Sequence, residues 1–346
     1  MYSPDGCHDL ALQKRPLLAF DETKDFAAQR KALREKLLEC LGDMPEKVDP
    51  EAEIEELTEH ETFTERRISF NVEEGVRAVG ILCIPKLGRK KYPLAVCVQG
   101  HNSGMHISLG RTKYPDDGPE DGDRDVAAQA LERGYAAFCL DQRGMGERRT
   151  LRDGDTENNG GPRCFYTAMN ALLVGRTLIG ERCWDVSRAI DLALTYPEID
   201  GEHILITGNS GGGTISFYAA CFDERIGVSM PSCAVCTYKH SIGAMLHCSC
   251  NYLPGISKFA DMGDLAAIIA PRKLVVIHGV EDPIFPDAGV RETYEIIQKV
   301  YKAADVPGNC ALATGMGDHR YYKKEAWEGF EKVTKGEWDR YGRTKN

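Results

Sequence analysis

HILITGNSGGGTISF, residues 203–217, passes without a break from an apolar strand pattern into a helical pattern. Residues 208–212, GNSGG, stand at the junction and match Gly-x-Ser-x-Gly, the sequence of a nucleophile elbow. Small residues on both sides of the serine let the chain turn sharply, so that the hydroxyl projects into a cleft at the helix N-terminus. We therefore predict Ser210 as a nucleophile, and the alternative interpretation is a structural glycine-rich turn.

Strand and helix patterns alternate on both sides of this turn. An antiparallel hairpin is predicted first, from RRISFNVEE and RAVGILCIP on either side of Gly75. Later apolar strands are predicted at 94–100, 135–142, 203–210, 227–235, 273–279 and 309–315. Amphipathic helices are predicted between several of these strands, in DVAAQALERG, SRAIDLALTYP, GGTISFYAACF and VRETYEIIQKVYKAA. This alternation predicts an α/β fold with a mostly parallel central sheet and helices on both faces.

The rest of the chain is predicted as an extension and two insertions. Residues 1–64 are expected to form a helical N-terminal extension packed on the main domain, with a helix that ends at Gly42 and an acidic segment that forms a linker or a helix face. Residues 65–346 then form the α/β domain. Insertions at about 142–184 and 236–271 are expected to build the walls of a pocket.

Composition excludes several classes of function. The 43 basic residues are outnumbered by 53 acidic ones, which argues against a nucleic-acid partner. The sequence has no apolar run long enough to span a bilayer and begins without a signal-peptide pattern. Most of the 13 cysteines lie in apolar runs as core residues, which favours reduced thiols in a cytoplasmic protein. A homo-oligomer is left open.

A serine nucleophile needs two partners. The hydroxyl is weak by itself, so it requires a general base, and the base requires a carboxylate to orient it. In this fold class both partners follow the serine along the chain. Asp282 and His319 each come directly after one of the last two predicted strands, so the order serine, aspartate, histidine is met. We predict Ser210, Asp282 and His319 as a catalytic triad.

Two neighbouring residues are alternatives for these roles. Glu281 could replace Asp282 as the acid, but the Asp-Pro step at 282–283 forms a rigid turn that suits a fixed partner. His278 could replace His319 as the base, but it lies within a predicted strand and is expected to be a core histidine. Both alternatives therefore rank below the predicted residues.

The developing oxyanion needs two backbone N–H donors. The N–H of Gly211, directly after the nucleophile, is the first candidate. The loop QGHNSG at 99–104 follows the strand of residues 94–98, and the N–H of His101 in this loop is the second candidate. The alternative for residues 99–104 is a plain polar loop.

These motifs resemble the α/β-hydrolase superfamily. The elbow, the HG-x-x-D-P turn at 278–283 and the Gly-x-His at 317–319 carry the resemblance, which extends over residues 65–335. More specific segments resemble bacterial acetyl xylan esterase-like and dienelactone hydrolase-like esterases: DQRGMGER (141–148), GRTLIGERCWDVSRAIDLAL (175–194) and HCSCNYLPG (247–255). The resemblance implies hydrolysis of short-chain esters, such as acetyl esters of a carbohydrate or small alcohol, without a cofactor.

Three side chains are predicted to contact the substrate. Gln99 stands where many members of the resembled superfamily have histidine before the glycine of the oxyanion loop, so it is expected near the leaving group. Arg143 follows a strand end and could bind a substrate carboxylate or hydroxyl, although an ion pair with a local acid ranks above this role. Trp184 belongs to the aromatic residues of the insertions that are expected to line or cover the pocket.

A group of cysteines and histidines could also hold a metal. Thiolates and imidazoles are the usual ligands of zinc. The spacing fits no standard finger or ribbon, so buried free thiols are expected instead and no metal site is assigned. The residues in question are Cys233, Cys236, His240, His247, Cys248 and Cys250.

The sequence thus predicts a serine esterase that acts on a small-molecule ester and needs no metal or organic cofactor. A serine peptidase of the prolyl-oligopeptidase type is the first rival, but the roughly 65 residues before the first strand are too few for the additional domain of such enzymes. A non-catalytic binding protein on a hydrolase fold is the second rival. It would require a broken triad, whereas all three members are present in order.

Overall fold

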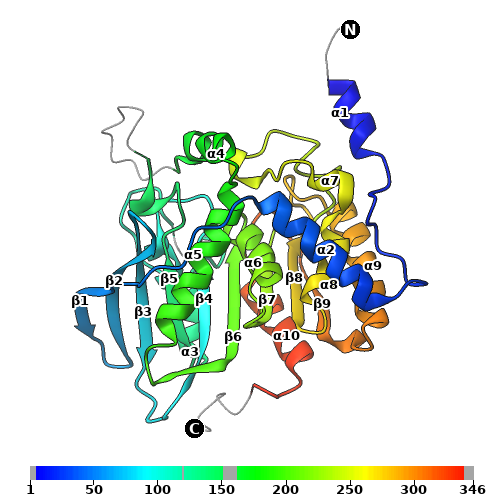
Figure 1. Ribbon diagram of the computed structural model, residues 1–346. Helices are drawn as coiled ribbons and strands as arrows, with labels where there is room; N and C mark the ends of the chain where they lie inside the picture. The colour runs from blue at the N-terminus through cyan, green and yellow to red at the C-terminus, as the bar shows by residue number, and fades with distance from the viewer. Residues whose placement is uncertain (1–4, 119–120, 151–161, 339–346) are drawn as a thin grey trace.

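The computed structural model describes residues 5–118, 121–150 and 162–338. These residues form one nine-stranded sheet in the order β1-β2-β3-β5-β4-β6-β7-β8-β9 (Figure 1). Its strands are β1 (Glu53–Glu59), β2 (Phe63–Glu73), β3 (Val76–Pro85), β4 (Tyr92–Val98), β5 (Ala136–Leu140), β6 (Ile199–Asn209), β7 (Ile226–Ser232), β8 (Lys273–Gly279) and β9 (Cys310–Gly315). From β5 to β9 all neighbours pair in parallel, whereas β1, β2 and β3 pair antiparallel. The predicted α/β architecture is confirmed.

Helices cover both faces of the sheet. One layer contains α2 (Phe26–Leu41), α5 (Leu178–Ala193), α6 (Gly211–Phe222), α8 (Met262–Ile269) and α9 (Asp287–Ala303), and α5 and α6 lie in front of the sheet in Figure 1. The other layer contains α3 (Val126–Glu132) and α10 (Lys323–Thr334), joined where the Trp327 indole N–H donates to Gln129 Oε1 at 3.2 Å. None of the helices in the described ranges is long and apolar enough to cross a lipid bilayer.

Shorter helices gather at the carboxyl ends of the parallel strands. α4 (Cys164–Leu173) and α7 (Ile256–Phe259) lie at this end, which is the top of Figure 1. Each belongs to one of the two predicted insertions. The remaining short elements are α1 (Asp5–Leu12), η1 (Met105–Leu109), η2 (Gly146–Arg148), η3 (Ser249–Asn251) and η4 (Pro307–Asn309).

The N-terminal extension is only partly helical. The predicted helix is present as α2, where the Asp25 carboxylate caps the amide of Ala28 at 2.7 Å and Gly42 ends the helix at a φ of 87°. Leu33 and Leu37 of α2 are buried in the main core, so this helix packs on the α/β domain.

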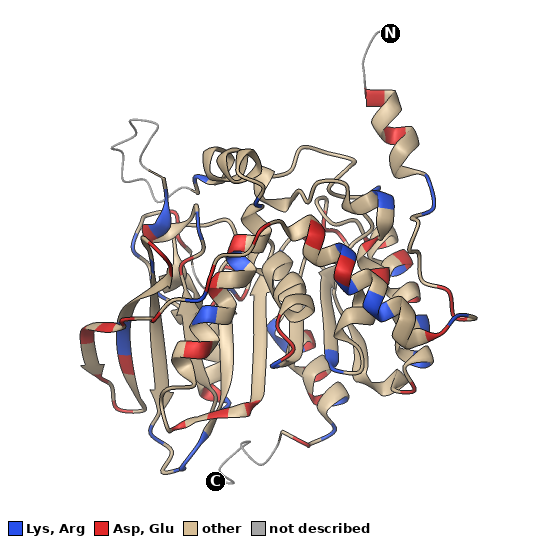
Figure 2. Cartoon of the chain, in the orientation of Figure 1, with Lys and Arg blue, Asp and Glu red and all other residues tan. Residues whose placement is uncertain are grey.

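The prediction for the acidic segment of the extension, residues 53–59, is wrong. The segment forms β1, an edge strand paired with β2, and is neither a linker nor a helix face. β2 begins at Phe63, so the sheet starts before the predicted boundary at residue 65. The backbone pairing of β1 depends on the neighbouring strand β2 and not on the charged side chains that dominate the sequence of β1. The glutamates remain exposed along the open edge (Figure 2), where like charge discourages pairing with another sheet edge.

Thr177 joins the start of α5 to the end of α2. The Thr177 hydroxyl donates to the carbonyl of Leu41 at 2.7 Å and accepts from the amide of Gly180 at 3.0 Å. It therefore caps α5 and also satisfies a carbonyl at the last turn of α2. Because Thr177 is buried, water cannot replace either partner.

We expect Thr177→Val to lower the free energy of unfolding by about 1–2 kcal/mol, since an isosteric methyl group can neither cap α5 nor donate to Leu41. Urea unfolding followed by circular dichroism measures the loss. Thr177→Ser keeps the hydroxyl and serves as the matched control, with a smaller expected loss. Equal losses in the two variants would contradict the assigned role of the hydroxyl.

Candidate active site

The turn at Ser210 has the geometry of a nucleophile elbow. Ser210 lies between β6 and α6 with φ 55° and ψ −120°, a strained conformation for a residue other than glycine. A Cβ on Gly212 would lie 2.0 Å from the carbonyl oxygen of Val98, and one on Gly208 would lie 2.1 Å from the same oxygen. Glycine is therefore required at both positions because α6 and β6 press against the end of β4. This packing holds Ser210 in its strained conformation.

The predicted triad members and oxyanion loop meet at the carboxyl ends of four parallel strands. Ser210 follows β6, His101 follows β4, and His319 comes four residues after the end of β9. All three line one pocket with a volume of about 350 Å³. Ser210 and His319 form no hydrogen bond to each other among the described contacts, and such bonds often tighten only when substrate is bound.

Asp282 and His319 form a fixed pair. His319 Nδ1 lies 2.8 Å from Asp282 Oδ2, and the amides of Ile284 and Phe285 donate to Asp282 Oδ1 at 2.8 and 3.1 Å. Burial alone would raise the pKa of Asp282, but the bonds from His319 and the two amides outweigh it and hold this pKa below its ordinary value. The Phe285 ring stacks on the His319 imidazole, with the two ring centroids 5.9 Å apart. The carboxylate and the ring together fix the orientation of His319.

His278 and Glu281, the alternatives for the base and the acid, do not take part in this pair. His278 is buried within β8, where its Nε2 lies 3.0 Å from the hydroxyl of Thr314. The carboxylate of Glu281 has no contact with His319 among the described interactions, whereas that of its neighbour Asp282 does. The geometry therefore favours Asp282 and His319.

Two backbone amides are free to hold an oxyanion. The N–H groups of Gly211 and His101 have no hydrogen-bond acceptor among the residues that the structure describes. The His101 ring lies against Gly211, because a Cβ on that glycine would come within 2.8 Å of His101 Cε1 and Nδ1. The two predicted donors thus belong to residues in direct contact.

Buried Asp141 organises the loop that carries His101. Its Oδ1 accepts from the Gln99 side-chain amide at 2.9 Å and from the backbone amide of Met105 at 2.7 Å, and its Oδ2 accepts from the amide of Glu147 at 2.9 Å. These bonds hold both ends of the loop 99–104. Gln99 lines the pocket as predicted, but its amide nitrogen is turned toward Asp141. Asp141 was not predicted as a site residue, and only its position at a strand end could have indicated it.

Much of the pocket wall is polar and charged. Asn102, Asp121, Arg124 and Arg320 line it, and Arg320 forms an ion pair with Asp123 at 3.1 Å. No motif pointed to these residues in the sequence, and Asp121 and Arg124 lie in the acidic loop of residues 115–125, which has no recognisable ligand spacing. Hydroxyl groups and other polar parts of a substrate suit such a wall better than a long alkyl chain does.

Comparison with known proteins supports this architecture. No protein-family profile matches the chain. YtaP from Bacillus subtilis (strain 168), a protein provisionally named as a hydrolase, is 23% identical over 299 residues, which is 85% of this chain and 96% of YtaP. A crystal structure from Bacteroides fragilis NCTC 9343, provisionally described as an acetyl xylan esterase, superposes with a TM-score of 0.77 and 18% identity, over 94% of this chain and 83% of that one.

Two further solved structures have the same architecture. A glucuronoyl esterase from Solibacter usitatus superposes with a TM-score of 0.67 and 16% identity, over 90% of this chain and 92% of that one. An acetyl xylan esterase from Paenibacillus sp. R4 superposes with a TM-score of 0.58 and 18% identity, over 95% of this chain and 98% of that one. The chain has the α/β-hydrolase fold. At these identities the likeness establishes the fold alone.

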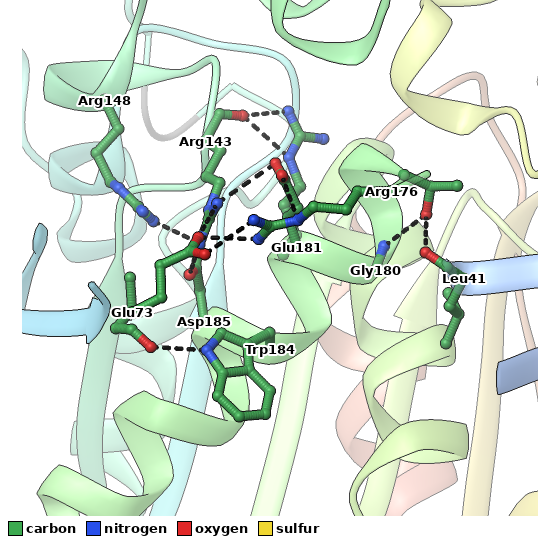
Figure 3. A network of polar contacts seen from close by, with 12 residues as sticks. Leu41, Glu73, Arg143, Arg148, Arg176, Gly180, Glu181, Trp184 and Asp185 are labelled. Atoms are coloured by element: carbon green, nitrogen blue, oxygen red, sulfur yellow. Dashed lines mark hydrogen bonds and ion pairs between the residues drawn. The ribbon is translucent and has the colours of Figure 1, made fainter. Parts of the chain in front are cut away.

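Arg143 lies in an ion-pair network and not on the pocket wall of this hydrolase fold (Figure 3). Its guanidinium makes two bonds of 2.8 Å to Asp185 and a third of 2.7 Å to Glu73. Arg148 also binds Asp185, at 2.6 Å, and Arg176 binds Glu73 at 2.8 Å. The assignment of Arg143 as a substrate-binding residue is therefore wrong, and the higher-ranked interpretation, an ion pair with local acids, is correct because carboxylates occupy its donors.

The prediction that Trp184 lines or covers the substrate pocket is also wrong. Its indole N–H donates to the carbonyl of Val72 at 2.7 Å (Figure 3). The Trp184 ring borders a separate surface hollow with Arg34 and Phe222. Trp184 lies within α5, which packs across the sheet, so its side chain follows the helix and does not face the carboxyl ends of the strands. The sequence placed it at the end of an insertion only because the start of α5 was not recognised.

Most of the predicted cysteine and histidine group is dispersed. Cys233 contacts the carbonyl of Arg320 at 3.2 Å, Cys236 that of Pro286 at 3.9 Å, and the rings of His240 and His247 bind other neighbours. Cys248 and Cys250 alone remain together, with their sulfur atoms 3.3 Å apart.

The network around Asp185 predicts a large loss of stability when its charge is removed. Burial alone would raise the pKa of Asp185, but Arg148 and Arg143 outweigh it and hold this pKa below its ordinary value. We expect Asp185→Asn to lower the free energy of unfolding by about 3–5 kcal/mol, because two buried guanidinium groups lose their shared carboxylate. Chemical denaturation at neutral pH measures this change.

Glu147→Gln is the matched control for this measurement. Glu147 is an exposed partner of Arg67 at 2.7 Å, and its loss is expected to cost no more than about 1 kcal/mol. A cost for Asp185→Asn as small as that of the control would contradict the network's role in stability.

Proposed function

We propose that this protein is a serine hydrolase of carboxylic esters. One observation carries the proposal: the strained elbow residue Ser210 shares a pocket with His319, whose Nδ1 is held by Asp282 at 2.8 Å. The provisional name of YtaP and the esterase activities named for the solved structures support the same reaction class. The predicted triad explains why these three residues occupy the ends of three different strands.

In the proposed mechanism, His319 accepts the proton of Ser210 as the serine oxygen attacks the ester carbonyl. The amides of Gly211 and His101 donate to the oxyanion. Asp282 keeps Nδ1 of His319 protonated and stabilises the imidazolium. The alcohol leaves with the proton from His319, and a water molecule activated by the same histidine then releases the acid from the acyl-enzyme.

The pocket supports a short acyl group on a hydroxylated alcohol. A volume of about 350 Å³ is at the small end of ligand pockets. Its apolar side chains are few, chiefly Val98 and Val126, whereas Gln99, Asn102 and Arg124 offer hydrogen bonds. Acetyl esters of a carbohydrate or of another small alcohol fit this balance, and acetyl xylan esterases are among the structural neighbours.

A reducing compartment is part of the proposal. All 13 cysteines are free thiols, and most of them are buried. Disulfides form and persist in oxidising compartments. A cysteine-rich chain without disulfides therefore favours a cytoplasmic location.

The test is hydrolysis of p-nitrophenyl esters from acetate to octanoate, with an acetylated xylo-oligosaccharide, a methyl glucuronoyl ester and a dipeptide amide in parallel. We expect cleavage of the acetate to exceed that of the octanoate by at least about tenfold in kcat/KM, because the polar pocket cannot bury a long alkyl chain. Ser210→Ala is expected to lower kcat/KM by at least about a thousandfold.

Ser216→Ala is the matched control. Ser216 lies in the same helix as the elbow, outside the pocket, and its hydroxyl donates only to the carbonyl of Gly212 at 2.8 Å. This variant should keep nearly all activity. Equal activity in Ser210→Ala and wild type would refute the assigned nucleophile, and cleavage of the dipeptide amide alone would favour the peptidase.

A further inference from the structure

Three separate segments bring four soft ligand groups together beside the pocket. These groups are His101 in the oxyanion loop, Cys164 at the start of α4, and Cys248 and Cys250 around η3. One ligand atom from each residue lies within 4.8 Å of every other. Cys164 and Cys250 are only 3% and 2% exposed, and all four residues belong to segments that the proposed reaction leaves without a role for these side chains.

The spacing of these atoms suits one tetrahedral ion. A zinc ion with bonds of about 2.3 Å to sulfur and about 2.0 Å to nitrogen holds its ligand atoms about 3.6–3.8 Å apart. Here His101 Nε2 lies 2.9 Å from Cys250 Sγ, and Cys250 Sγ lies 3.3 Å from Cys248 Sγ. These two distances need to lengthen by less than about 1 Å to admit the ion, and all four ligand atoms already lie within 4.8 Å of one another.

The buried positive charge of Arg182, beside Cys164, also favours a metal site with thiolate ligands. The Arg182 guanidinium is 2% exposed and donates to Cys164 Sγ at 3.2 Å, with its other bonds going to the carbonyl of Arg143. Among the described residues no carboxylate forms an ion pair with Arg182. A buried cation without a carboxylate requires another anion nearby. Three thiolates and one neutral imidazole around Zn²⁺ carry a net charge of −1, which matches a single arginine.

We propose that His101, Cys164, Cys248 and Cys250 form a zinc site with three sulfur ligands and one nitrogen ligand. His101 coordinates through Nε2, the atom that faces Cys250, and the thiols bind as thiolates after releasing their protons. Four protein ligands fill a tetrahedral zinc, so the site is structural and leaves no position for substrate.

The zinc site connects the oxyanion loop to the two predicted insertions, whose described residues do not line the pocket of Ser210, contrary to the expectation that they build its walls. Cys164 belongs to the first insertion, and Cys248 and Cys250 belong to the second. His101 carries one of the two proposed oxyanion amides, and its ring lies against Gly211, which carries the other. The ion therefore fixes both insertions to the oxyanion loop. This consequence for activity rests on the proposed function, whereas metal binding does not.

The spacing along the chain hid this site. Cys248 and Cys250 are separated by one residue, and the other two ligands lie 84 or more positions earlier. No finger or ribbon has such a pattern, and the sequence grouped Cys248 and Cys250 with residues that the fold carries elsewhere. The expectation that this protein needs no metal is therefore replaced by the proposed site.

The test measures metal in the whole chain. Protein from zinc-supplemented cells is passed through gel filtration in metal-free buffer. Inductively coupled plasma mass spectrometry is then expected to find about one zinc ion per chain. Replacement of zinc by Co²⁺ is expected to give thiolate-to-cobalt charge-transfer absorption and the intense visible bands of tetrahedral cobalt. Cys164→Ser and Cys250→Ser should each reduce retained zinc by at least about tenfold.

Cys40→Ser is the matched control, because Cys40 is a buried cysteine of α2 outside the cluster and should retain full zinc. Wild-type protein that holds no zinc and shows no cobalt–thiolate absorption would overturn the proposal, as would cluster variants that keep as much zinc as Cys40→Ser. Copper or iron on the same cysteines, or a disulfide between them in metal-free wild type, would overturn the assignment to zinc. The cobalt spectrum of wild type decides the matter even if a cluster variant fails to fold.

Ester hydrolysis is assayed separately on the same samples. Loss of zinc without loss of folding should lower activity, since the amide of His101 loses its anchor. Zinc binding in a protein that cleaves no ester would leave the metal site intact and refute only the proposed function.

Discussion

The close approach of β4, β6 and α6 is the constraint on which the site depends. Val98 at the end of β4 pairs in parallel with Gly208 of β6, and its carbonyl oxygen leaves no room for a Cβ on Gly208 or Gly212. The chain can leave β6 only by the abrupt turn at Ser210, at a φ of 55°. Because the loop that follows Val98 starts at the same point of the sheet, the second oxyanion donor necessarily lies beside the nucleophile.

Buried polar groups hold the loops around this turn. Asp141 ties both ends of the oxyanion loop, and Asp282 fixes the ring of His319. Arg143 and Asp185 belong to an ion-pair network behind the same loops, which explains why an arginine beside a strand end does not reach the pocket. Each of these carboxylates is buried and hydrogen-bonded, so the removal of one partner disturbs the position of a loop as well as stability. The proposed zinc site continues this arrangement into the insertions.

The sequence predicted what repeats locally and missed what depends on long-range contacts. Apolar strands and the elbow around Ser210 were recognisable because each has its own pattern, and Asp282 and His319 followed from their places after strands. β1 was missed because its pairing with β2 overrides a charged sequence. The partners of Arg143 lie 38 to 70 positions away along the chain, and the cluster around Cys164 joins three separate segments. Only the fold brings such residues together.

Covalent labelling of the intact protein with a fluorophosphonate tests the central claim most directly, because this reagent phosphonylates a serine oxygen, with loss of fluoride, only where a base and an oxyanion site activate it. Peptide mass spectrometry should find a single adduct, on Ser210, and His319→Ala should abolish it while the protein remains folded. No adduct on the wild-type protein, or an adduct on another serine with Ser210 unmodified, would contradict the account.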